Sequence, residues 1–138
     1  MSATNNSLDR ASVRRHVIIE ASAKEVWNFV GDPVRIQEWF PGIIRSTLEG
    51  NLRTITTNSG ISITEEIVTN DPLQHRFQYK INAPFVVEHL STIDLFQIGD
   101  DRCLIAYSVD ADPSTMALVI GAAGGNALHN LKTIVERN

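Results

Sequence analysis

Two ionisable side chains on separate predicted strands, Glu65 and His89, could carry acid–base chemistry. A carboxyl group in apolar surroundings has a raised pKa, and an imidazole titrates near pH 6.5, so the two could move a proton together. In an enolisation, dehydration or ring closure, Ser91 or Tyr79 would hold the substrate carbonyl. The alternative is structural: Glu65 pairs with Arg53 or another strand arginine, and His89 hydrogen-bonds Ser91. Both interpretations stay open at the level of sequence.

Other catalytic chemistries find little support. The only lysines are Lys24, Lys80 and Lys132, each on a predicted outward face, so no desolvated lysine is available for a Schiff base. The four histidines lack the i, i+4 spacing that places two ligands on one helix, and no metal site is expected. The single cysteine, Cys103, excludes an internal disulfide and a cysteine-based zinc cluster. The glycine-rich segment 121–126 lacks the lysine of a phosphate-binding loop, so no cofactor is expected.

Length and composition indicate one folded, soluble domain. Of the 138 residues, 43% are hydrophobic and 20% are charged, and the formal net charge is −4. An acidic chain is poorly suited to nucleic acid or anionic membranes. No apolar run approaches the ~20 residues that a membrane helix needs. The first dozen residues lack the apolar core of a signal peptide, so we expect a cytoplasmic protein.

The hydrophobic pattern predicts one strand, two short helices, six more strands and a long C-terminal helix. Residues 1–12 are polar and aperiodic, which predicts a disordered tail, and 13–138 form a single domain. The predicted strands are 13–19, 43–48, 52–57, 61–69, 75–81, 87–96 and 103–109. Their regular spacing and tight turns indicate an antiparallel meander.

Alternation within the strands places polar residues on the enclosed face of the sheet. Glu65 falls among the isoleucines of its strand, and His89 and Ser91 fall among apolar residues such as Ile93. A curved sheet against one helix encloses either a core or a cavity, and these polar residues favour a cavity. The predicted lining is Trp39 near the mouth, Ile63, Glu65, Phe77, Tyr79, His89, Ser91, Tyr107, Ile120, Gly124 and Ala127.

Three glycines, Gly121, Gly124 and Gly125, interrupt the predicted C-terminal helix. A glycine in a helix costs up to ~1 kcal/mol relative to alanine, so three close together need a reason. They could thin the helix wall beside a ligand cavity. Alternatively, they form a small-residue face on which the helix packs close to the sheet.

A set of short motifs runs in order along the chain: Glu25-Val26-Trp27, Gly31-Asp32-Pro33, Glu38-Trp39, Pro41-Gly42, Leu48-Glu49-Gly50, Glu65-Glu66-Ile67 and Tyr79-Lys80-Ile81. This ordered set resembles the START-like, helix-grip superfamily (SRPBCC), specifically its bacterial polyketide cyclase/dehydrase family. The resemblance implies an α+β helix-grip fold, in which a curved seven-stranded antiparallel sheet wraps around a long C-terminal helix and encloses an apolar cavity. It implies no single reaction, because the superfamily includes cyclases, lipid and quinone carriers, and receptors.

By position, the resemblance matches Glu65 to an inward glutamate and Ser91 to a cavity-facing serine. His89 stands where relatives usually carry tyrosine, and Tyr107 where they commonly carry tryptophan. We therefore expect the domain to bind a small hydrophobic molecule, such as a polyketide, lipid or isoprenoid-like compound. One alternative is a cofactor-independent cyclase or dehydratase that uses Glu65 and His89. The other is a carrier that presents lipid or quinone to a protein partner, as a monomer or homodimer without membrane insertion.

Overall fold

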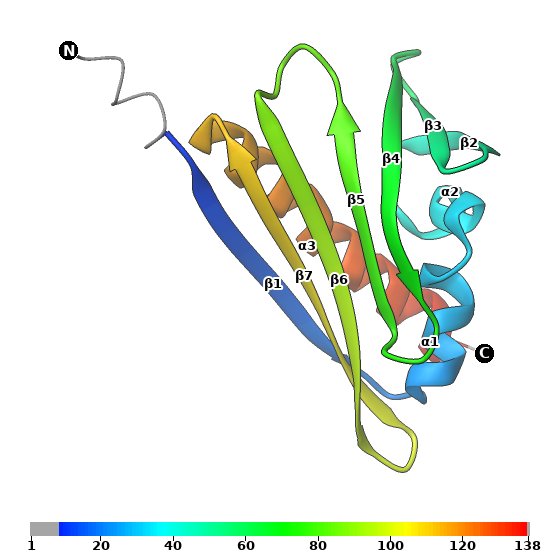
Figure 1. Ribbon diagram of the computed structural model, residues 1–138. Helices are drawn as coiled ribbons and strands as arrows, with labels where there is room; N and C mark the ends of the chain where they lie inside the picture. Colours follow the sequence, from blue (N-terminus) through cyan, green and yellow to red (C-terminus); the bar gives the residue numbers. More distant parts are fainter. Residues whose placement is uncertain (1–8, 138) are drawn as a thin grey trace.

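A seven-stranded antiparallel sheet curves against one long helix in the computed structural model, which describes residues 9–137 (Figure 1). The strand order across the sheet is β1-β7-β6-β5-β4-β3-β2. The strands are β1 (Ala11–Ile19), β2 (Ile43–Glu49), β3 (Leu52–Thr57), β4 (Ser62–Asp71), β5 (Arg76–Asn82), β6 (Glu88–Gly99) and β7 (Arg102–Asp112). The helices are α1 (Ala23–Val30), the 3-10 turn η2 (Pro33–Arg35), α2 (Ile36–Trp39) and α3 (Ser114–Glu136). This is the α+β helix-grip fold that the sequence predicts.

Several local boundaries depart from the prediction. β6 and β7 each end three residues later than predicted, at Gly99 and Asp112. β1 begins at Ala11, so the last two residues of the expected tail belong to a strand, and residues 1–8 of that tail lie outside the described residues. The second short helix is a 3-10 turn that continues into one turn of α-helix, and Asp32 makes no capping hydrogen bond. α1 begins after Ser22, whose Oγ accepts a hydrogen bond from the Glu25 backbone N–H at 3.1 Å.

The glycines of α3 face the sheet. α3 packs against β1 and β7, and a Cβ at position 121 would lie 2.8 Å from Cγ1 of Val13. At Gly124 a Cβ would lie 3.3 Å from the ring of Tyr107, and Gly125 also faces β1. Small residues at these positions therefore let α3 approach the sheet closely, which is the packing alternative raised by the sequence. No helix within residues 9–137 has the length and apolarity to cross a bilayer.

Candidate functional site

A half-open cavity of about 420 Å³ lies between the inner face of the sheet and α3. Its walls come from α2, the α2–β2 connection, β2, β3, β4, β5, the β5–β6 loop and the first half of α3. The lining residues are Ile36, Phe40, Pro41, Gly42, Ile43, Ile55, Thr57, Asn58, Ile63, Glu65, Tyr79, Ile81, Phe85, Met116, Val119, Ile120 and Ala123. Most of these side chains are apolar. The polar side chains Glu65 and Tyr79 belong to its most buried part, since each residue is 2% exposed.

Four of the residues predicted to line a cavity do line it: Ile63, Glu65, Tyr79 and Ile120. The other seven do not line it, although all are buried: Trp39, Phe77, His89, Ser91, Tyr107, Gly124 and Ala127. Of these, His89 lines a second hollow, described below. The reason is the position of α3, which packs directly on β1 and β7 and leaves the hollow over β3, β4 and β5.

Sequence reasoning missed most of the helical wall. Met116, Val119, Ile120 and Ala123 follow the i, i+3, i+4, i+7 spacing of one helix face and all line the cavity. This spacing is visible in the sequence and predicts that the four side chains lie on the same face of the helix. Phe85 was less predictable, because it lies in the β5–β6 loop, where no periodicity applies.

Glu65 forms a buried ion pair with Arg53 on the adjacent strand. Arg53 Nε lies 2.7 Å from Glu65 Oε1, and the two side chains are 2% and 3% exposed. The Arg53 guanidinium also donates to the carbonyl oxygen of Pro33 at 3.0 Å and lies over the rings of Phe77 and Tyr79. Burial raises the pKa of Glu65 above its ordinary value, and the charge of Arg53 opposes that rise.

His89 has both ring nitrogens engaged. The backbone N–H of Ile81 donates to Nδ1 at 2.8 Å, and Nε2 lies 2.7 Å from Ser91 Oγ. Because Nδ1 accepts, the ring is neutral and its proton sits on Nε2, which donates to Ser91. Burial lowers the pKa of His89 to about 4, which agrees with a neutral ring. Glu65–Arg53 and His89–Ser91 are therefore the structural pairings that the sequence offered as the alternative to acid–base chemistry.

Two buried tyrosines complete the polar interior. The hydroxyl groups of Tyr79 and Tyr107 hydrogen-bond each other. Burial raises the pKa of Tyr79 to about 12 and also raises the pKa of Tyr107. Both phenols are thus neutral, and Tyr79 brings this neutral pair to the cavity wall.

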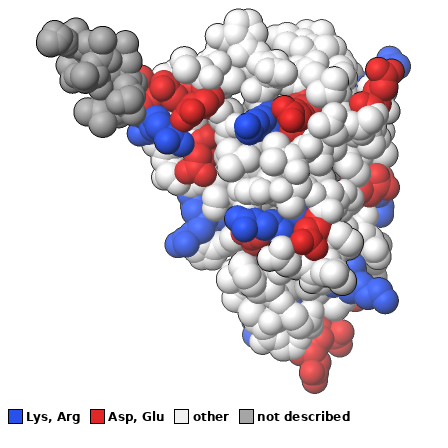
Figure 2. Space-filling view, in the orientation of Figure 1, with Lys and Arg blue, Asp and Glu red and all other residues white. Residues whose placement is uncertain are grey.

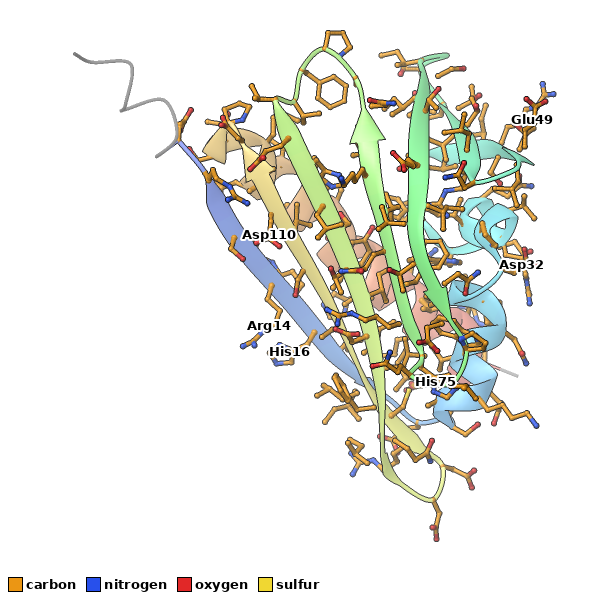
Figure 3. The ribbon with its side chains drawn as sticks, viewed as in Figure 1. Arg14, His16, Asp32, Glu49, His75 and Asp110 are labelled. Atoms are coloured by element: carbon orange, nitrogen blue, oxygen red, sulfur yellow. The ribbon has the colours of Figure 1, made fainter. Side chains whose placement is uncertain are left out.

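A second hollow of about 350 Å³ opens on the outer face of the sheet, beside the ends of β5 and β6. Its wall includes His89 and the apolar residues Ile81, Val87 and Leu90. The rest of the wall is mostly charged, with Glu66, Lys80, Asp110 and an ion pair between Arg10 Nε and Glu88 Oε1 at 2.9 Å. Figure 2 shows side chains of both charge signs on this face, and Figure 3 places Asp110 on it. Such a wall suits an apolar ligand poorly, so the cavity beside α3 is the stronger candidate site.

The histidines do not assemble into a metal centre. Figure 3 shows His16 on β1 and His75 close to α1, at separate places on the molecule. The His75 ring packs against Trp27, with 5.4 Å between ring centroids. Among residues 9–137, no three His, Cys, Asp or Glu side chains gather in a way that could hold a metal ion.

Comparison with known proteins agrees with this geometry. A family model described as polyketide cyclase / dehydrase and lipid transport matches residues 10–136. XoxI from Bacillus cereus has a TM-score of 0.84 at 24% identity, covering 91% of this chain and 95% of that chain. The ZhuI aromatase/cyclase from Streptomyces sp. R1128 has a TM-score of 0.78 at 16% identity, covering 93% and 94%. Norcoclaurine synthase from Thalictrum flavum has a TM-score of 0.73 at 15% identity, covering 91% and 93%. These likenesses establish the fold, and no curated protein matches the chain.

Proposed function

This chain belongs to the polyketide cyclase/dehydrase and lipid transport family, and we propose that it binds a small, largely apolar molecule in the cavity beside α3. The observation that carries the proposal is the apolar hollow of about 420 Å³ that reaches Glu65 and Tyr79. Protein interiors are close-packed, with few voids larger than a water molecule, so a hollow of this size favours an occupant. Ligand pockets of known proteins span the same range of volumes.

Affinity and orientation would come from different parts of the wall. Burial of apolar ligand surface contributes about 25 cal/mol per Å² before ordering costs, so the aliphatic and aromatic side chains supply most of the affinity. Arg53 engages Oε1 of Glu65. The second carboxylate oxygen, Oε2, would then accept a hydrogen bond from a ligand hydroxyl or amine. The ligand class that fits is a polyketide, lipid or isoprenoid-like compound with a polar group at one end.

A matched pair of variants tests this proposal. Ala123 lines the cavity, whereas its neighbour Ala122 is exposed and does not line it. We expect Ala123→Phe to weaken binding of the apolar fluorophore N-phenyl-1-naphthylamine at least tenfold, and Ala122→Phe to leave it unchanged. Native mass spectrometry against aromatic and isoprenoid compounds would then identify better ligands. Equal binding by both variants, or no binding of any compound, would refute the proposal.

A cofactor-independent cyclase or dehydratase is the second candidate, favoured by one observation. The Glu65 carboxyl lines an apolar cavity, where burial raises its pKa, and a carboxyl group in such a position can exchange a proton with a bound substrate. His89 is a poor partner in this reaction, because both of its nitrogens are engaged. For an enzyme, Glu65→Gln should abolish turnover of a polyketide-like substrate and change its affinity less than tenfold. Full turnover by this variant would exclude the candidate.

A further inference from the structure

The Glu65 carboxylate presents a free hydrogen-bond acceptor to the cavity. Its Oε1 accepts from Arg53 Nε at 2.7 Å, and no other hydrogen bond within residues 9–137 reaches this carboxylate. Glu65 lines the cavity, and Oε2 is not among the fully buried atoms that lack a partner in this part of the chain. Oε2 is therefore an acceptor without a partner that is accessible from the cavity.

The positive member of the ion pair is hidden from the same cavity. Arg53 contacts Glu65 but does not line the cavity, and only 2% of the residue is exposed. Two of its guanidinium nitrogens donate to Glu65 and to the carbonyl oxygen of Pro33, and the third, Nη2, is fully buried without a partner. A ligand in the cavity therefore meets the carboxylate and not the guanidinium.

The other polar side chains of the wall add no positive charge. Of the residues within 9–137 that line the cavity, none is Lys, Arg or His. The hydroxyl group of Tyr79 bonds that of Tyr107, and Thr57 is hydrogen-bonded within the β3–β4 turn. Asn58 is exposed to solvent, where water competes for its amide group. The Glu65 carboxylate therefore decides which polar group a ligand can place in the buried part of the cavity.

Hydrogen bonding and charge together select the polar end of the ligand. A neutral hydroxyl group can donate to Oε2 and leaves the charges of Arg53 and Glu65 balanced. A carboxylate has no proton to donate and would place a second negative charge beside Glu65, with the guanidinium out of reach. An ammonium group would add an unbalanced positive charge to the interior. A ligand with no donor would cover Oε2 and leave it unsatisfied.

We propose that the cavity selects apolar molecules whose polar end is an uncharged hydrogen-bond donor, such as a phenol or an alcohol, and rejects carboxylate anions, fatty acids among them. Glu65 determines this specificity, and Arg53 positions its carboxylate. The inference rests on the proposed ligand binding and narrows the ligand class given there to its hydroxyl-bearing members.

Three naphthalenes that differ only in their polar group test the selection. They are 2-naphthol, a neutral donor; 2-methoxynaphthalene, which has an oxygen but no donor; and 2-naphthoate, an anion at pH 7.5. Each competes with N-phenyl-1-naphthylamine for the wild-type protein, and the fluorescence of this probe gives the Kd of the competitor. We expect 2-naphthol to bind roughly tenfold more tightly, or better, than either of the other two compounds.

Two variants identify the residues responsible. Arg53→Met/Glu65→Leu removes both charges, and well-packed apolar replacements of a buried ion pair often preserve stability. In this variant 2-naphthol and 2-methoxynaphthalene should bind alike, and circular dichroism checks the fold. Glu66→Gln is the matched control, because Glu66 is the next residue on β4 and lines the charged hollow on the outer face. It should keep the wild-type preference.

Equal affinity of the wild type for the three compounds, or tightest binding of 2-naphthoate, would overturn the selection. A folded Arg53→Met/Glu65→Leu protein that still prefers 2-naphthol, or a lost preference in Glu66→Gln, would also overturn it. If the double variant does not fold, the wild-type series decides. Failure of the proposed function looks different, because then neither the probe nor any naphthalene binds. Equal binding of all three compounds refutes the selection alone.

Discussion

His89 takes the place of a backbone hydrogen-bond acceptor. Register pairing between β5 and β6 ends at Tyr79 and Ser91, although β5 continues to Asn82. The N–H of Ile81 therefore donates to the imidazole. Leaving a buried donor without an acceptor costs about 1–3 kcal/mol, so the ring stabilises the point where the two strands diverge.

This arrangement predicts a pH-dependent stability. Burial lowers the pKa of folded His89 to about 4, whereas an unfolded histidine titrates near pH 6.5. Between these values the unfolded chain binds the extra proton. The contribution of His89 is therefore complete above pH 6.5 and is lost as the pH falls toward 4, by at most about 1.4 kcal/mol per pH unit. Urea unfolding from pH 4.5 to 7.5 measures it, and His89→Gln should lack this component. The same pH slope in both proteins would contradict a buried, neutral imidazole.

At the residue scale, the sequence predicts on which face of the sheet a side chain lies, but not with which other side chain it pairs. Glu65, His89 and Ser91 are 2%, 5% and 0% exposed, as the two-residue period of their strands predicts. Alternation fixes the side of the sheet on which a residue lies. It gives no distance across the sheet, so only the structure distinguishes the Glu65–Arg53 pair from a Glu65–His89 pair.

At the element scale, the order of strands and helices follows from hydrophobic periodicity, and the position of α3 does not. Periodicity identifies the apolar face of a helix, but it leaves open which strands that face covers. The glycines determine which strands α3 covers, because they let the helix approach closely there. Gly121 and Gly125 face β1, and Gly124 faces β7. Close packing on one half of the sheet is also why the cavity lies over the other half.

The close approach of α3 to β1 predicts that position 121 tolerates no large side chain. We expect Gly121→Leu to lower the free energy of unfolding by about 1–3 kcal/mol, because overpacking forces Val13 and the helix apart. Ala122→Leu is the matched control, since Ala122 is exposed on the same helix and should change little. Thermal and urea denaturation measure both. A stable Gly121→Leu protein that no longer binds an apolar probe would restore the alternative in which the glycines thin a cavity wall.

At the scale of the whole molecule, the domain divides into a packed half and a hollow half. β1, β7 and the glycine face of α3 form the packed half, where buried side chains fill the space between helix and sheet. The cavity is enclosed by β2, β3, β4, β5, α2, the β5–β6 loop and the first half of α3. Elements around a hollow have fewer buried apolar contacts and open locally at lower free energy.

Ligand binding should therefore protect the two halves unequally from hydrogen exchange. A ligand at 100 times its Kd adds about 2.7 kcal/mol to global stability, which slows exchange from globally unfolded molecules everywhere. We expect segments 81–87 and 116–123, next to the cavity, to exchange by local opening and to gain additional protection with N-phenyl-1-naphthylamine. β1 and the last turns of α3 should gain only the global effect. Ala123→Phe should remove the local gain, because its side chain fills the space of the ligand. Protection centred instead on 88–90 and 110 would move the binding site to the charged hollow on the outer face of the sheet.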